Sequence, residues 1–158
     1  MDIRLQKATP ADAETLRAMQ AEAFAPLLEK YQDRETSPAL ETTERILQRL
    51  QHPALDWYLL CAGDRCVGAI RVLRKENSVY RVGGLFVLPA CQRRGYATAA
   101  LAAVEARYPD ALVWELDTIA QEAGNCRLYE RIGYRRTGEA SVVNERMTLV
   151  AYEKQVQK

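Results

Sequence analysis

The sequence is poor in the residues that most often build metal sites and nucleophiles. It has one histidine, His52, and four cysteines, at positions 61, 66, 91 and 126. The spacing of the cysteines matches no zinc pattern, and a cysteine nucleophile would want a histidine base. A cross-strand contact between Cys61 and Cys66 stays open, although buried free thiols suit a reducing compartment better. We therefore expect no metal and no catalytic cysteine.

An excess of charge and a long apolar run are also missing. Lys+Arg 22 against Asp+Glu 21 leaves a formal net charge of +1, so no global field would draw the protein to nucleic acid or to an anionic membrane. No apolar run approaches the ~20 residues that span a bilayer, and the first residues lack the apolar core of a signal peptide. We expect a cytoplasmic protein with neither nucleic acid nor membrane as a partner.

Two common nucleotide signatures are absent as well. No Gly-x-Gly-x-x-Gly follows a strand and no Gly-x-x-x-x-Gly-Lys occurs, so dinucleotide and nucleoside triphosphate sites lack their usual loops. The overall composition is ordinary for a globular protein, with 48% hydrophobic and 27% charged residues. The length fits one domain with a single substantial core, which we place over residues 1–158.

One stretch organises the chain. Residues 79–89 are β-branched, aromatic and apolar, and they predict a buried strand. Residues 97–104 are rich in alanine and predict a helix. The short loop between them carries Arg93, Arg94 and Gly95. Unpaired N–H groups and the positive dipole end at a helix start make an anion site, and a phosphate can approach the backbone at Gly95, which has no Cβ.

This stretch resembles motif A of the GNAT family of N-acetyltransferases. The family pattern, Gln/Arg-x-x-Gly-x-Gly/Ala, stands here as residues 92–97, after a strand that ends in Val87-Leu88-Pro89. The resemblance implies that loop N–H groups hold the pyrophosphate of acetyl-CoA and that the strand end offers main-chain groups to the pantetheine arm. The implied acetyl-CoA-binding residues are Leu85, Phe86, Val87, Arg93, Arg94, Gly95, Tyr96, Ala97 and Thr98.

Residues 125–134 resemble GNAT motif B, whose core is Leu-Tyr-x-x-x-Gly-Phe/Tyr. Two motifs in the right order, with a strand between them, are far more specific than either alone. The resemblance implies an α/β GNAT fold: a mixed, mainly antiparallel sheet with a splayed parallel strand pair, flanked by helices. It also implies direct acetyl transfer from acetyl-CoA to an amine in a ternary complex. The acceptor would be a small molecule or a peptide N-terminus, and a homodimer stays open.

Tyr129 matches the family tyrosine that protonates the CoA thiolate as it leaves. A phenol titrates near ~10 and a thiol near ~8.5, so the proton transfer is a small uphill step. The alternative is a core aromatic beside Leu128 and Ile132. We favour catalysis because a buried hydroxyl would otherwise need another partner.

A base is needed because most amines are protonated at neutral pH. Many GNAT enzymes place a glutamate on the strand before motif A, where this chain has Gly83. Asp117 matches another family position, a carboxylate at the end of the splayed strand, and Glu115 has the same strand parity. A solvated strand end is the alternative for both.

Motif B departs from the family at one position. The family asparagine seven residues before the tyrosine is Glu122 here, and Asn125 lies four before it, on the same helix face. Asn125 either takes over the contact to pantetheine or substrate, or caps a helix that starts late. The departures at Glu122 and Gly83 keep a rival interpretation open, a non-catalytic acyl-CoA-binding regulatory module.

The rest of the chain predicts a meander of strands after an N-terminal helical region. Strands are expected at 3–8, 57–62, 67–73, 111–117, 134–137 and 147–152. Gly83-Gly84 predicts a bulge or a close backbone approach, and Leu112 is expected to be buried. Residues 138–146 are expected to form a loop.

The acceptor side is the least readable region. The first helix should begin near Pro10 and be kinked or ended by Pro26, with a loop or broken helix over 28–38 and another helix over 41–50. Glu22, Tyr31 and Asp33 are candidate substrate contacts there, with solvated loop residues as the alternative.

Overall fold

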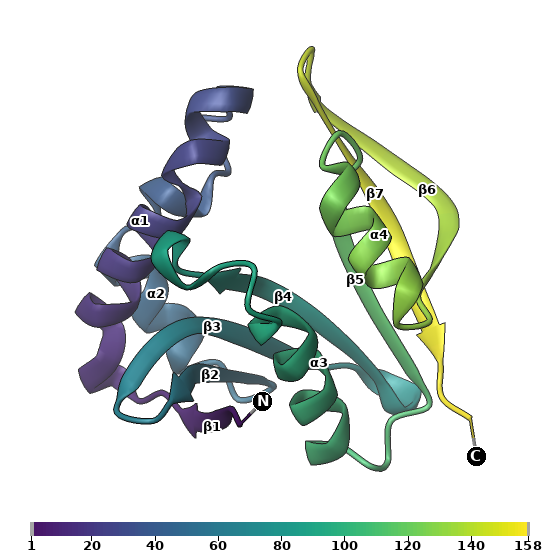
Figure 1. The fold of residues 1–158 in the computed structure, drawn as a ribbon, viewed down its shortest axis with the longest axis horizontal. Helices are drawn as coiled ribbons and strands as arrows, with labels where there is room; N and C mark the ends of the chain where they lie inside the picture. Colours follow the sequence, from purple (N-terminus) through teal and green to yellow (C-terminus); the bar gives the residue numbers. More distant parts are fainter. Residues whose placement is uncertain (1, 158) are drawn as a thin grey trace.

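The computed structural model describes residues 2–157, and its strands form one continuous sheet. The strands are β1 (Arg4–Lys7), β2 (Leu55–Ala62), β3 (Arg65–Arg74), β4 (Val79–Val87), β5 (Val113–Ile119), β6 (Arg135–Asn144) and β7 (Met147–Gln155). The helices are α1 (Ala13–Tyr31), α2 (Thr43–Leu50), α3 (Tyr96–Arg107) and α4 (Ala123–Arg131). The sheet order is β1-β2-β3-β4-β5-β7-β6, with helices on both faces (Figure 1).

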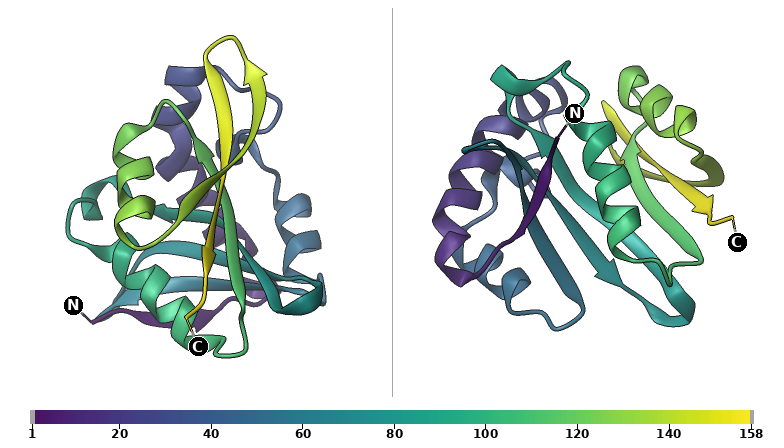
Figure 2. Two further views of the ribbon diagram at one scale, coloured as in Figure 1. Left: turned by 90° about the vertical axis from the view of Figure 1, so that its right-hand side faces the viewer. Right: turned by 60° about the horizontal axis from the view of Figure 1, so that its bottom comes forward.

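Each face of the sheet has its own apolar cluster. Leu16 of α1 and Ile46 of α2 pack on one face against Trp57 and other apolar side chains of the central strands. Leu101 of α3 packs on the opposite face against side chains such as Ile70, and Cys126 of α4 joins the same cluster. The two views of Figure 2 show these helices on opposite sides of the strands. Alternation of side chains along each strand supplies both clusters from one sheet.

One strand pair in the sheet is parallel. β4 and β5 pair only through residues 79–81 and 113–115, and the long connection through α3 between them is what a parallel pair requires. All other neighbouring strands are antiparallel. Beyond the paired residues β4 and β5 diverge into an open fork (Figure 1). The predicted mixed, mainly antiparallel sheet with one splayed parallel pair is confirmed.

The predicted bulge lies in β4 beside the fork. Ala69 of β3 pairs with Phe86 and Arg71 pairs with Gly83, so β4 contains one extra residue between these pairs. Gly84 has φ 56, a left-handed value that glycine adopts most readily. An extra residue reverses the alternation of side chains. As a result Val82 packs in the cluster under α3, whereas Phe86 packs in the cluster under α1.

The first helix is longer than the sequence indicates. α1 continues through Pro26 to Tyr31. Of the two expectations for Pro26, that it kinks or that it ends the helix, the ending is wrong, and the loop or broken helix expected over 28–38 starts only after Tyr31. A proline inside a helix costs about 3 kcal/mol. Packing on both sides of it offsets that cost: Phe24 contacts Phe86 edge-to-face at 5.7 Å, and Tyr31 is 3% exposed.

Two further expectations are wrong near the C-terminal hairpin and at the start of β5. Residues 138–144 are strand rather than loop, because β6 and β7 pair along most of their length and the register shift between Arg136 and Ala140 accommodates Gly138 at φ 97. Leu112 was expected to be buried in a strand, but it is 48% exposed because β5 begins only at Val113.

Candidate functional site

Two adjoining cavities lie at the open end of the fork. The larger cavity has a volume of about 630 Å³ and lies between α1, the end of β4, the start of α3 and α4. The smaller cavity has a volume of about 260 Å³ and lies between α1, the loop after it, the bulge of β4, β5 and β7. Residues from α1, β4 and α4 line both cavities, so the two are halves of one cleft; they are Phe24, Leu27, Leu85, Asn125 and Tyr129.

The start of α3 forms one wall of the larger cavity. Gly95 is the N-cap with φ 82 and supplies no side-chain cap. The N–H groups of the first helical residues, Tyr96 to Thr98, therefore have no acceptor from the helix itself. They combine with the helix dipole into a local positive field without any charged side chain. This wall suits a phosphate group.

The loop before α3 is held to the end of β4. Gln92 Nε2 donates to the Val87 carbonyl at 2.9 Å, and Arg93 adopts φ 65, a conformation that costs a non-glycine residue on the order of 1 kcal/mol. In the sequence, Gln92 stands out only as part of the family pattern. Its amide is a positioning group that fixes the loop, and no periodicity in the sequence signals that role.

The structure gathers most of the expected acetyl-CoA-binding residues around the larger cavity. Its lining includes Leu85, Phe86, Val87, Arg93, Gly95, Tyr96, Ala97, Thr98 and Asn125. Arg94 lines neither cavity. Beyond Arg81 no strand of the described residues pairs with the side of β4 that faces the fork, so main-chain groups there are open to a ligand. The residues fit a phosphate-bearing group at the helix start joined to an extended arm along β4.

Tyr129 lies where the two cavities meet. Its ring packs against Tyr134 at 5.9 Å and Tyr152 at 6.2 Å, and its hydroxyl makes no hydrogen bond within residues 2–157. Burial, and then the nearby Cys126, raises the pKa of Tyr129 to about 12. The phenol therefore stays neutral at working pH and can donate toward the cleft.

The two candidate carboxylates of β5 have different surroundings. Asp117 lines the smaller cavity, and its Oδ2 accepts a hydrogen bond from Arg81 Nη2 at 2.8 Å. Glu115 lines neither cavity: it is paired with Lys75 and lies 3.9 Å from Arg81 Nη1. Strand parity makes them equivalent, but the fork opens only at the level of Asp117.

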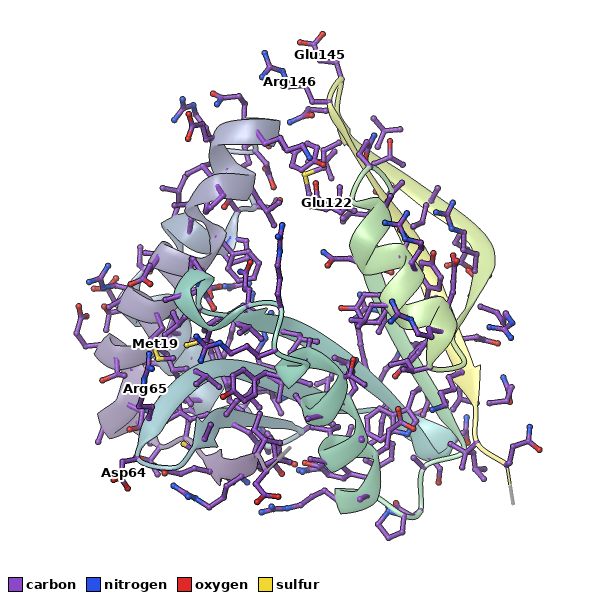
Figure 3. The ribbon with its side chains drawn as sticks, in the orientation of Figure 1. Met19, Asp64, Arg65, Glu122, Glu145 and Arg146 are labelled. Atoms are coloured by element: carbon purple, nitrogen blue, oxygen red, sulfur yellow. The ribbon has the colours of Figure 1, made fainter. Side chains whose placement is uncertain are left out.

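Asn125 and Glu122 both line the larger cavity, but only Asn125 also lines the smaller one. Asn125 lines both cavities and lies inside α4, whose N-cap is Glu122, so the alternative that Asn125 caps the helix is wrong. Glu122 extends toward the end of α1 (Figure 3), where its Oε2 accepts from the Tyr31 hydroxyl and, at 2.7 Å, from Lys30 Nζ. Burial alone would raise the pKa of the Glu122 carboxyl, but these two donors outweigh it and lower that pKa.

The candidate substrate contacts on the acceptor side also differ in whether they line a cavity. Tyr31 and Asp33 line the smaller cavity, and Glu22 lines neither. Asp33 is 6% exposed and accepts from the Thr36 backbone N–H at 3.0 Å, so it fixes the turn after α1. Sequence reasoning missed Arg71, which lines the smaller cavity. A charged residue within the apolar strand Val67–Leu73 was the available signal.

Residues 2–157 contain no cluster of three or more His, Cys, Asp or Glu side chains that could hold a metal ion. All four cysteines are free, with the Cys61 and Cys66 Sγ atoms 3.5 Å apart. No helix in this part of the chain combines the length and apolarity that a membrane crossing requires.

The fold is similar to many solved acetyltransferase structures. An acetyltransferase from Thermus thermophilus superposes with a TM-score of 0.79 at 17% identity, covering 99% of this chain and 98% of that one. The PaiA N-acetyltransferase from Thermoplasma acidophilum, solved with coenzyme A, gives 0.75 at 15% identity, covering 99% and 100%. The spermidine N-acetyltransferase from Vibrio cholerae, solved with CoA and spermine, gives 0.77 at 12%, covering 97% and 95%.

Sequence comparison gives the family. No curated protein matches the sequence. Residues 16–134 match the family model described as the acetyltransferase (GNAT) family. That match spans well over half of the chain and includes both motifs, the bulged strand and the fork. The chain belongs to the GNAT acetyltransferase family.

Proposed function

We propose that the protein moves the acetyl group of acetyl-CoA to a primary amine by direct transfer in a ternary complex. The observation that carries this proposal is the meeting of two cavities at Tyr129, one beside the unpaired N–H groups of α3 and the other beside Asp117. Family membership supports acetyl transfer, and two structural neighbours were solved with coenzyme A.

Acetyl-CoA is the substrate of the larger cavity. Its pyrophosphate takes the N–H groups from Arg93 to Thr98, and its pantetheine arm takes main-chain groups from Leu85 to Val87 and the amide of Asn125. Nothing larger than a methyl group projects from Ala97, so the phosphate can approach the helix start closely. The thioester then lies near Tyr129, which lines both halves of the cleft.

The amine occupies the smaller cavity and attacks the thioester carbonyl, and the CoA thiolate leaves. Tyr129 donates to the departing sulfur. Its pKa of about 12 lies some 3 to 4 units above that of a thiol near ~8.5, so complete proton transfer is uphill by about 5 kcal/mol. Tyr129 therefore stabilises the thiolate mainly as a hydrogen-bond donor, and the proton lost by the amine can neutralise the sulfur afterwards.

Asp117 accepts the proton of the incoming ammonium, directly or through a water, or holds the ammonium before it is deprotonated. One of its oxygens is engaged by Arg81, and Oδ1 has no partner among residues 2–157. The free oxygen can serve the amine. An open path between the two cavities makes a covalent acetyl-enzyme unnecessary.

Mixing the protein with acetyl-CoA and a panel of small amines, amino acids and peptides tests the proposal, with release of the CoA thiol as the readout. We expect release that depends on the amine and rises with both substrates in a pattern of intersecting lines, as a ternary complex requires. Binding of acetyl-CoA without amine-dependent release would instead support the regulatory module. Failure to bind acetyl-CoA would overturn both.

A further inference from the structure

The smaller cavity contains a positive charge that no described residue neutralises. The guanidinium of Arg71 lines this cavity and makes no hydrogen bond or ion pair within residues 2–157. The acidic side chains of the same cavity are engaged elsewhere: Asp117 accepts from Arg81 Nη2 at 2.8 Å, and Asp33 accepts from the Thr36 N–H at 3.0 Å. Among the described residues that line this cavity, Arg71 is thus the one cation, and it has neither a hydrogen bond nor an ion pair.

The strands give Arg71 a fixed position. It pairs across the sheet with Trp57 on one side and with Gly83 on the other. Its guanidinium carbon lies 5.0 Å from the centroid of the Trp57 ring. A Cβ on Gly84 would lie 2.7 Å from Arg71 Nε, and one on Gly83 would lie 3.6 Å from Nη2. The two glycines of the bulge therefore make room for the guanidinium at the floor of the cavity.

The surroundings do not supply a counter-ion. The nearby carboxylate of Glu41 accepts from Arg49 Nε and from Gln20 Nε2, each at 2.9 Å. Burial first, and then the charge of Arg49, lowers the pKa of Arg71 to about 10, so the group is still charged at neutral pH. An unpaired buried charge is unfavourable, and an incoming anion would remove that cost.

We propose that Arg71 binds a carboxylate of the acceptor, and hence that the acceptor is an amine that also carries a carboxyl group. This inference rests on the proposed amine acetylation. The planar guanidinium can hold a carboxylate through two parallel hydrogen bonds. A polyamine would bring further positive charge toward Arg71 and be repelled. The apolar lining of the cavity suits the carbon skeleton of an amino acid; it includes Leu27, Leu28, Met147 and Leu149.

The test compares each common L-amino acid with its α-carboxamide as the acceptor, with thiol release from acetyl-CoA as the readout. The pairs aspartate and asparagine, and glutamate and glutamine, examine a side-chain carboxylate in the same panel. For the preferred acceptor, we expect kcat/KM of the acid to exceed that of its amide by at least about tenfold. Arg71→Met should remove the preference and leave kcat/KM of the amide within about threefold.

Comparing the acid-to-amide ratio between variants cancels the different basicities of the amines. Arg71→Lys keeps the charge without the planar fork and should retain part of the preference. The matched control is Arg45→Gln, because Arg45 is an exposed cation near Arg71 that lines neither cavity. Its ratio should equal that of the parent protein. Arg71→Met should also melt no lower than the parent, since it removes an unpaired buried charge.

The inference is overturned if the parent prefers amides, polyamines or peptide N-termini, or if Arg71→Met slows acids and amides equally. Should no amine be acetylated, the proposed function fails, and the carboxylate site is then read from melting temperatures with CoA present. Amino acids should raise the melting temperature of the parent and not that of Arg71→Met. Absence of this difference would overturn the carboxylate site as well.

Discussion

The polar side chains at the two ends of the β4–β5 pair differ in whether they have hydrogen-bond partners. At the paired end the Tyr80 hydroxyl donates to Asp110 at 2.6 Å and the Tyr108 hydroxyl donates to Asp56 at 2.6 Å, and the rings of Tyr80, Tyr108 and Trp114 contact one another. At the open end, the side chains of Tyr129, Asn125 and Arg71 have no hydrogen-bond partner within residues 2–157.

The difference indicates which end is built for stability and which for binding. Buried polar groups in folded proteins are nearly always satisfied, and the paired end follows this rule. The open end leaves donors pointing into a cleft, where a substrate can complete them. Mutations at the paired end should therefore change stability, whereas mutations at the open end should change rates and affinities.

Asp56→Ala should have the largest effect and act on stability. The Asp56 carboxylate is buried and binds Tyr108, Lys7 and Arg74, so its removal takes the acceptor from the buried Tyr108 hydroxyl and the counter-ion from two partly exposed cations. We expect the free energy of unfolding, measured by urea denaturation, to fall by about 3 kcal/mol. A loss below about 1 kcal/mol would contradict the contrast between the two ends.

The Asp56 carboxylate should also make the stability of the protein depend on pH in the acidic range. Burial alone would raise the pKa of Asp56, but hydrogen bonds from Tyr108, Lys7 and Arg74 lower it below its usual value. A carboxyl group with a lowered folded-state pKa stabilises the protein above its unfolded pKa of ~3.9, and that contribution is lost as pH falls through the folded value. Asp56→Ala should lose this component of acid sensitivity.

Tyr129→Phe should lower turnover by about 10²-fold, the lower end for one lost hydrogen-bond donor to a developing negative charge, and leave the free energy of unfolding within about 1 kcal/mol because the hydroxyl has no hydrogen-bond partner among residues 2–157. The pKa of about 12 means that the neutral phenol persists to high pH. The basic limb of kcat/KM against pH should therefore show no fall centred near 10. Unchanged turnover of a reactive amine, with chemistry rate-limiting, would assign Tyr129 to the core.

Gly95→Val should weaken acetyl-CoA binding by at least about tenfold. Gly95 has φ 82, a strained value for a β-branched residue, so the loop would relax away from the liganded shape and binding would have to restore it at about 1–3 kcal/mol. The rise in melting temperature caused by acetyl-CoA should vanish. Arg94→Gln, at a position that lines neither cavity, is the control and should keep most of the rise. Equal binding by Gly95→Val and the parent would exclude the pyrophosphate site.

Asp117→Asn should reduce kcat/KM by about fivefold at neutral pH, less than the ~10² of a fully committed base, because Arg81 already engages one oxygen. The acidic limb of the profile should move to higher pH, with a larger loss for strongly basic amines. Glu115→Gln, outside both cavities, should change the rate by less than about twofold. Identical profiles for Asp117→Asn and the parent would make Asp117 a solvated strand end.

Asn125→Ala should have the smallest effect, about a threefold rise in KM for acetyl-CoA, which is the loss of one neutral hydrogen bond. Glu122→Gln should change this KM by less than about twofold, since the Glu122 carboxylate borders the larger cavity but is already engaged by Lys30 and Tyr31. A larger effect at Glu122 than at Asn125 would reverse the two assignments.

The sequence by itself determined most of the strands, the parallel pair and the strand, loop and helix around the start of α3. These features follow from local patterns: alternation in the strands, glycine in the loop and alanine in the helix. Gly83-Gly84 predicted a bulge or a close backbone approach, and the structure has the bulge.

Only the tertiary structure decided the rest. Continuation of α1 through Pro26 depends on packing against β4, and local propensity cannot express that gain. Asp117 and Glu115 share strand parity, and only the position of the fork distinguishes them. Arg71 carries no motif, and its role follows from what three neighbouring strands leave unpaired around it. Whether a polar group has a partner depends on residues distant in sequence. For that reason the sequence could name Tyr129 but could not show that its hydroxyl makes no hydrogen bond within residues 2–157.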